Sequence, residues 1–76
     1  MFIKIQDHIV NMDNFDSIMT QDAYREGEGF RIIFVWEQCS INNNLEFFYS
    51  DKKTRDLKLN TIILAMRNGE NFVDLD

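Results

Sequence analysis

The chain contains 76 residues and carries a formal net charge of −5, because 13 acidic side chains outnumber 8 basic ones. This length is enough for one domain, which we place at residues 1–76, and too short for two. The single cysteine, Cys39, and the single histidine, His8, exclude an internal disulfide and leave too few ligands for a structural zinc site, so no cofactor is expected.

The composition indicates a folded, cytoplasmic protein. Apolar residues make up 45 % of the chain, which is close to the average for globular domains. No apolar run approaches the roughly 20 residues that a membrane span needs, and the first residues lack the apolar core of a signal peptide. An unpaired cysteine fits a reducing compartment. We therefore expect a cytoplasmic protein with no membrane partner.

The chain begins with three short extended segments. Residues 2–5 form a first predicted strand, and residues 9–12 form a second strand after a polar break at residues 6–8. Asp and Asn side chains at residues 12–15 favour a turn. Residues 16–21 then resume an extended pattern.

The clearest strand signal comes in the middle of the chain. Residues 30–36 are dense in β-branched and aromatic side chains over a length typical of a strand. The polar residues 22–28 before them predict a hairpin loop, and residues 40–44 after them predict another turn. Residues 45–49 form the last predicted strand.

From about Lys53 the apolar pattern changes to a helical period. Apolar residues then recur at three- and four-residue spacing, which marks one face of a helix: Leu59, Ile62, Ile63 and Met66. Consecutive strands followed by a helix indicate an α+β fold. We predict an antiparallel β-meander of four to five strands capped by one C-terminal helix.

The ends of this helix also carry signals. Ser50 or Thr54 is expected to cap its start, and Arg67 to lie in its last turn. Gly69 stands where a left-handed residue commonly ends a helix. Phe72 is expected to fold back against the helix end.

One helix can cover only one face of such a sheet. Because side chains alternate along a strand, one face holds Phe30, Ile32, Phe34, Trp36, Leu45, Phe47 and Tyr49. The opposite face holds Met19, Ile33, Val35 and Phe48. Strong curvature of the sheet would bury both faces. Otherwise these four residues form an apolar patch for dimerisation or for docking a partner protein.

No group of residues has the spacing that catalysis or metal binding requires. His8 is expected to be a solvated turn residue. Cys39 is expected to be an inert thiol, because a reactive thiol needs a nearby base and an electropositive setting, whereas its neighbour Glu37 is negatively charged. The sequence Gly27-Glu28-Gly29 lacks the residues of a phosphate-binding loop. Several loop acids fail the EF-hand spacing: Asp13, Asp16, Asp22, Glu26 and Glu28. We predict that the protein is not an enzyme.

Basic residues gather at the start of the predicted helix, where the helix dipole disfavours cations: Lys52, Lys53, Arg55 and Lys58. One interpretation is a solvated collar offset by Asp51 and Asp56. The other is an electrostatic docking site for an acidic partner or a nucleic-acid backbone. Such a small cluster would give only a weak, salt-sensitive contact.

The two ends of the chain resemble a known layout. The opening Phe2-Ile3-Lys4-Ile5 with Ile9-Val10-Asn11, and the close from Ile62 to Gly69 followed by Phe72 and Asp74, resemble small bacterial and phage proteins, most without an assigned function. Those proteins are similar to a minimal pleckstrin-homology-like sheet capped by a helix. The resemblance implies the fold alone. Their helix usually starts with acidic residues, whereas here it starts Lys52-Lys53-Thr54-Arg55.

Together these observations predict a non-enzymatic protein-interaction module, phage-related or homodimeric through the sheet face that the helix leaves uncovered. An alternative is an acidic inhibitor that mimics nucleic acid and acts on a host nuclease or DNA-binding complex. A further alternative is a weak nucleic-acid binder that uses the basic helix start. Residues 1–50 carry eight acids and three bases, which disfavours contact with phosphate backbones.

Overall fold

The computed structural model describes residues 1–22, 29–36 and 44–76. In chain order these residues form β1 (Phe2–Ile5), β2 (His8–Asn11), the 3-10 turn η1 (Met12–Asn14), β3 (Ser17–Gln21), β4 (Phe30–Val35), β5 (Leu45–Tyr49), α1 (Lys52–Arg67) and β6 (Phe72–Asp74). The predicted α+β class with one C-terminal helix is confirmed. The predicted loop at 22–28, the turn at 40–44 and Cys39 lie wholly or mostly outside the described residues.

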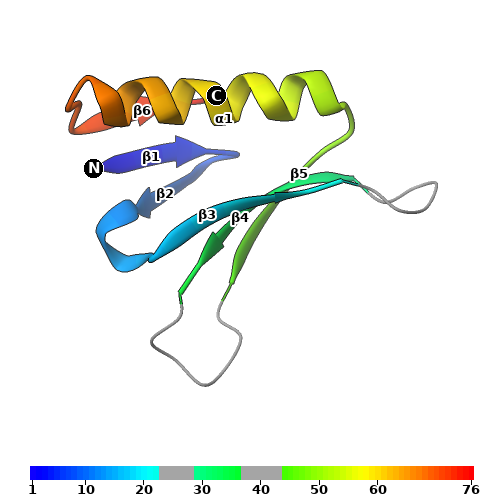
Figure 1. Cartoon of the computed structure of the whole chain (residues 1–76), viewed down its shortest axis with the longest axis horizontal. Helices are drawn as coiled ribbons and strands as arrows, with labels where there is room; N and C mark the ends of the chain where they lie inside the picture. Colours follow the sequence, from blue (N-terminus) through cyan, green and yellow to red (C-terminus); the bar gives the residue numbers. More distant parts are fainter. Residues whose placement is uncertain (23–28, 37–43) are drawn as a thin grey trace.

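The six strands form two three-stranded sheets, not one continuous meander (Figure 1). One sheet has the order β3-β4-β5 and is antiparallel throughout. The other has the order β2-β1-β6, in which β1 pairs antiparallel with β2 and parallel with β6. Because β6 follows the helix, α1 forms the connection between the two sheets and packs against β4, β5 and β6.

The β1–β2 hairpin turns through two residues with positive φ, Gln6 (48°) and Asp7 (64°). Two such residues match the twist of the flanking strands, but side chains other than glycine pay a steric cost there. The carboxylate of Asp76 accepts hydrogen bonds from the backbone N–H groups of both residues, at 2.6 and 3.0 Å. The segment after β6 therefore stabilises the first turn of the chain.

The start of α1 differs from the prediction. The N-cap is Asp51, and neither Ser50 nor Thr54 fills that position. The Asp51 carboxylate accepts hydrogen bonds from the backbone N–H of Thr54 at 2.9 Å and from its hydroxyl at 3.0 Å. An aspartate is well suited to this position because it satisfies a free amide and carries a negative charge at the positive end of the helix dipole.

The end of α1 agrees with the prediction. Gly69 has a φ of +68°. Its N–H bonds to the carbonyl of Met66 at 3.2 Å, and the N–H of Glu70 bonds to the carbonyl of Ala65 at 3.0 Å, the pattern of a Schellman motif. This motif turns the chain back toward β1.

Phe72 does not fold against the helix end as predicted. It lies in β6 opposite Phe2 and is 50 % exposed. The alternate residues Val73 and Leu75 are buried instead. The alternation of residues 72–75 is a strand signal, but the three residues of β6 are too few to predict a strand from the sequence alone.

The core lies between the inner faces of the two sheets and one side of α1. The sheet residues predicted to face the helix include three buried ones: Ile32, Phe34 and Phe47. They meet a set of buried side chains from β1, β2, α1 and the β6 region: Ile3, Ile5, Val10, Ile62, Ala65, Val73 and Leu75. Every described element except η1 and β3 thus contributes at least one buried residue to one cluster.

Two neighbouring isoleucines of α1 test this arrangement. Ile62 is fully buried, whereas Ile63 is 42 % exposed. We expect Ile62→Val to lower the free energy of unfolding by about 0.5–1.5 kcal/mol, because it opens a small cavity in the core. The matched change Ile63→Val should stay within about 0.5 kcal/mol of the parent. Urea unfolding measures both, and equal losses would contradict the helix orientation.

Candidate protein-interaction surfaces

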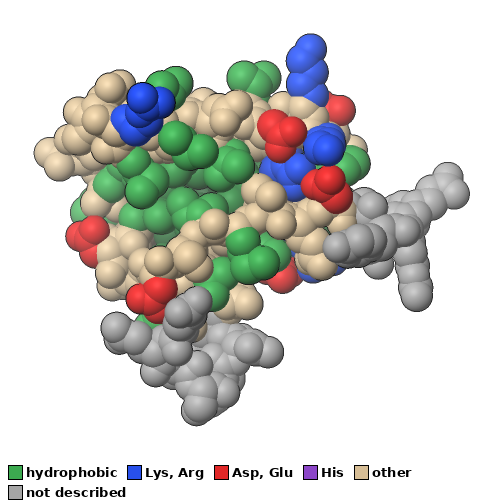
Figure 2. All heavy atoms as spheres, viewed as in Figure 1, with side chains coloured by type: hydrophobic (Ala, Val, Ile, Leu, Met, Phe, Trp, Pro, Cys, Tyr) green, Lys and Arg blue, Asp and Glu red, His purple; other side chains and the backbone are tan. Residues whose placement is uncertain are grey.

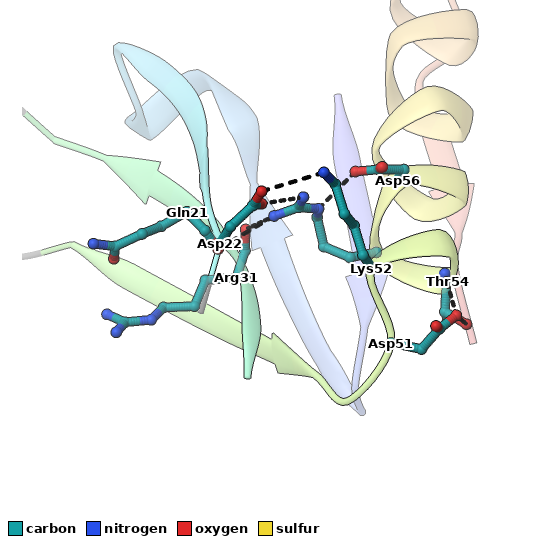
Figure 3. A network of polar contacts seen from close by, with 8 residues as sticks. Gln21, Asp22, Arg31, Asp51, Lys52, Thr54 and Asp56 are labelled. Carbon is teal, nitrogen blue, oxygen red and sulfur yellow. Dashed lines mark hydrogen bonds and ion pairs between the residues drawn. The ribbon is translucent and has the colours of Figure 1, made fainter. Parts of the chain in front are cut away.

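Arg55 is the only charged side chain that is buried among the described residues, with 2 % of its surface exposed. Its Nη1 donates to the backbone carbonyls of Gln21 (3.2 Å) and Arg31 (3.3 Å). Nη2 donates to Asp22 at 2.6 Å, and Nε donates to Asp56 at 2.7 Å (Figure 3). One guanidinium therefore ties the first turn of α1 to the end of β3 and the start of β4.

These contacts hold the charges of the network in place. Burial acts to lower the pKa of Arg55, but the hydrogen bonds to Asp22 and Asp56 outweigh it and raise the pKa above its usual value. The hydrogen bonds from Arg55 and then from Lys52, whose Nζ lies 3.3 Å from Asp22, lower the pKa of the Asp22 carboxyl. A buried cation is tolerated when it is paired and hydrogen-bonded in this way.

The four cations predicted as a docking site lie in different surroundings. The sequence predicts that Arg55 is a solvated or partner-binding cation, and this prediction is wrong because the Arg55 side chain is buried. The Nζ of Lys58 donates to the backbone carbonyl of Leu75, and Lys52 is paired with Asp22. Lys53 is exposed. A shallow hollow of about 520 Å³ at this end of the helix is lined by Asp51, Lys52, Lys53, Asp56, Leu57 and Asn60.

The outer β3–β5 face is the side of that sheet that points away from the core, and it holds the four residues predicted for partner binding. Met19 lies opposite Ile33 in the register, and Val35 is two residues further along the same strand. Phe48 of β5 lies opposite Arg31, which precedes Ile33 by two residues on β4 and so points to the same face. The pairing therefore brings the four residues onto one face.

Exposure on the outer β3–β5 face is uneven. Met19 is 50 % and Phe48 53 % exposed, whereas Ile33 is only 5 % exposed. Arg31 lies 3.5 Å from Glu46 in an ion pair, and its guanidinium lies over the Phe48 ring at 5.3 Å. Ile33 is therefore buried within the single chain, and Met19 and Phe48 are the large apolar side chains that this face presents to solvent.

A second apolar surface, which we call the methionine groove, was not found from the sequence. It is a hollow of about 250 Å³ whose apolar lining is Met1, Met12, Phe15, Ile18 and Met66. In Figure 2, hydrophobic side chains gather in a broad patch between α1 and the η1–β3 segment. Asp13 and Asp16 also line the groove. Its residues come from distant parts of the chain, so no local sequence signal marks it.

The outer face of the β2-β1-β6 sheet is a third exposed apolar surface. Phe2 (46 % exposed) lies beside Phe72 (50 % exposed) in the parallel register. Ile9 is 68 % exposed on the same sheet. The sequence does not predict this surface, because Phe2 and Phe72 become neighbours only when β6 pairs with β1.

The groups considered for catalysis and metal binding are dispersed. The ring of His8 packs against Phe47 with a centroid distance of 5.6 Å. Among the described residues, no three His, Cys, Asp or Glu side chains converge as a metal site would require. No helix in the described part of the chain has the length and apolar character needed to cross a membrane.

Comparison with protein-family models, curated proteins and solved structures found no match to this chain.

The pKa of Asp22 offers a test of the Arg55 network. A carboxyl whose pKa is lowered by folding stabilises the fold above its unfolded pKa, and this contribution disappears as the pH falls through the folded pKa. In Lys52→Met we expect the pKa of Asp22 to rise toward its usual 3.8, and the loss of stability below about pH 4 to become smaller.

Carboxyl NMR titration measures this change. Asp76 is the internal control, because its pKa is lowered mainly by the Asp7 and Gln6 amides and should not move in Lys52→Met. An unchanged pKa of Asp22 would contradict the ion pair with Lys52.

Proposed function

We propose that the chain is a non-enzymatic protein-interaction module that self-associates through the outer β3–β5 face. One observation carries the proposal: Met19 and Phe48 are each about half exposed on a sheet face that α1 does not cover. A contiguous apolar patch on a sheet marks a surface that binds another protein, and Met19 and Phe48 lie on the two strands beside Ile33 on this face. The resemblance to small phage and bacterial proteins stays a prediction.

The charges on this face favour a second copy as the partner. Arg31 and Glu46 carry opposite charges, so two copies of the face do not confront each other with like charge. Phe48 is the cross-strand partner of Arg31 and lies two residues from Glu46 on the same strand. In the proposed dimer, a two-fold axis near Phe48 brings the two Phe48 side chains together and places each Arg31 near Glu46 of the second copy.

The size of the face sets the expected strength of the dimer. Stable interfaces bury roughly 800 Å² on each partner. The three strands of this face have only 5, 6 and 5 residues, so the face is smaller than that at the usual strand spacing. We therefore expect a weak, concentration-dependent dimer.

The nucleic-acid alternatives receive less support from the geometry. Arg55 is buried, and Lys58 and Lys52 make contacts within the chain, so the basic helix start offers little free charge to a phosphate backbone. Many described carboxylates are likewise engaged in hydrogen bonds or ion pairs that stabilise the fold: Asp22, Glu46, Asp51, Asp56, Asp74 and Asp76. A mimic of nucleic acid would need its carboxylates in an exposed, unengaged array.

Sedimentation across a range of concentrations tests the proposed dimer. We expect the parent chain to shift from monomer to dimer as its concentration rises. Phe48→Gln should weaken the dimer by at least about tenfold, the effect of losing an aromatic anchor worth more than about 1.4 kcal/mol.

The matched control is Leu57→Gln. Leu57 is 59 % exposed, close to the value for Phe48, but it lies on α1. This variant should dimerise like the parent chain. A parent chain that remains monomeric at every concentration, or equal weakening by both substitutions, would refute self-association through this face.

A further inference from the structure

The methionine groove has features that the proposed dimer does not use. Its lining combines Met1 before β1, Met12 and Phe15 around η1, Ile18 of β3 and Met66 in the last turn of α1. Met66 is 54 % exposed, whereas the other four are partly buried and pack against the core. The groove therefore has an apolar floor that packs against the core, and one wall, Met66, that is open to solvent.

The size and composition of the groove indicate what kind of group it holds. A hollow of about 250 Å³ is smaller than most small-molecule sites, which span roughly 300–1,000 Å³, and suits a large apolar side chain. Methionine is unbranched and polarisable, so a surface rich in it adapts to side chains of different shape. Three of the four methionines of the chain lie here.

The charged groups of the groove add a second requirement. Asp13 and Asp16 both line it, and the side chain of Asp13 is 80 % exposed. The Met1 amine lies 3.5 Å from one oxygen of Asp13, and the exposed carboxylate can accept a second cation at its other oxygen. Arg67 follows Met66 and projects about 100° further round the helix, toward its outer side. The lining and the net charge of −5 therefore favour a cationic group on the ligand.

We propose that the methionine groove binds a short segment of a partner protein in which a large apolar side chain lies next to a Lys or Arg. The apolar side chain fills the hollow between Met12, Phe15 and Met66, and it supplies most of the affinity because it leaves water entirely. The cation pairs with Asp13 at the open side and contributes mainly to specificity and to the rate of association. This site is separate from the dimer face and does not depend on self-association.

Selection from a displayed library of random short peptides tests the proposal with the full-length chain as bait. We expect the selected peptides to share a large apolar residue next to Lys or Arg. Selected peptides without a basic residue, peptides rich in acids, or no selection at all would overturn the proposal.

Methionine-methyl NMR then locates the binding site of a selected peptide. Met12 and Met66 report on the groove, and Met19, on the outer β3–β5 face, is a control within the same molecule. We expect saturable shifts of the Met12 and Met66 methyl signals while Met19 stays unchanged. Shifts of the Met19 signal alone would place peptide binding on the outer β3–β5 face and overturn the proposal. The dimer is tested separately by sedimentation, so failure of one proposal is distinguishable from failure of the other.

Matched variants complete the test. Met66→Gln should weaken peptide binding by at least about tenfold, whereas Leu64→Gln should not, although Leu64 has nearly the same exposure (55 %). Asp13→Asn should weaken binding several-fold at low salt and reduce its dependence on ionic strength. Equal effects of Met66→Gln and Leu64→Gln would refute the proposal.

Discussion

A single amphipathic helix closes the core between two small sheets, and the rest of the structure follows from that constraint. One face of α1 has to meet both the β3-β4-β5 sheet and the β6 region. Ile62 and Ala65 occupy the middle of this face and are buried. At the start of the helix the same face carries Arg55, so the closure there is made by hydrogen bonds and charge instead of apolar contact. Loss of that guanidinium would leave the ends of two strands without their connection to the helix.

The same constraint explains why so much apolar surface remains outside the core. A domain of this size buries a smaller share of its surface than a larger one, because its surface is large relative to its volume. The helix covers the inner sides of the sheets and leaves both outer faces to solvent. It also leaves the methionine groove open along η1 and β3. The exposed apolar surfaces therefore exist because α1 is too small to cover more than the inner sides of the two sheets.

Three aspartates stabilise turns and connections of the fold. Asp51 caps the helix, Asp76 holds the β1–β2 turn, and Asp22 pairs with Arg55. Each of them lies at the surface and accepts hydrogen bonds from backbone amides or from a cation, so that it holds a helix end, a turn or a strand end in place. The proposed binding role involves the exposed apolar side chains, whereas these aspartates stabilise the fold.

Local patterns in the sequence determined the strands up to residue 49, the helix with its glycine stop, and the sheet face that holds Met19 and Phe48, because alternation and helical period involve only near neighbours. The partner of a strand is not encoded locally, so the parallel pairing of β6 with β1, and with it the exposed pair Phe2 and Phe72, was decided by the tertiary structure. The same holds for Arg55, which resembles its neighbouring surface lysines until the ends of β3 and β4 enclose it. The methionine groove joins residues from both ends of the chain, and only the folded arrangement brings them together.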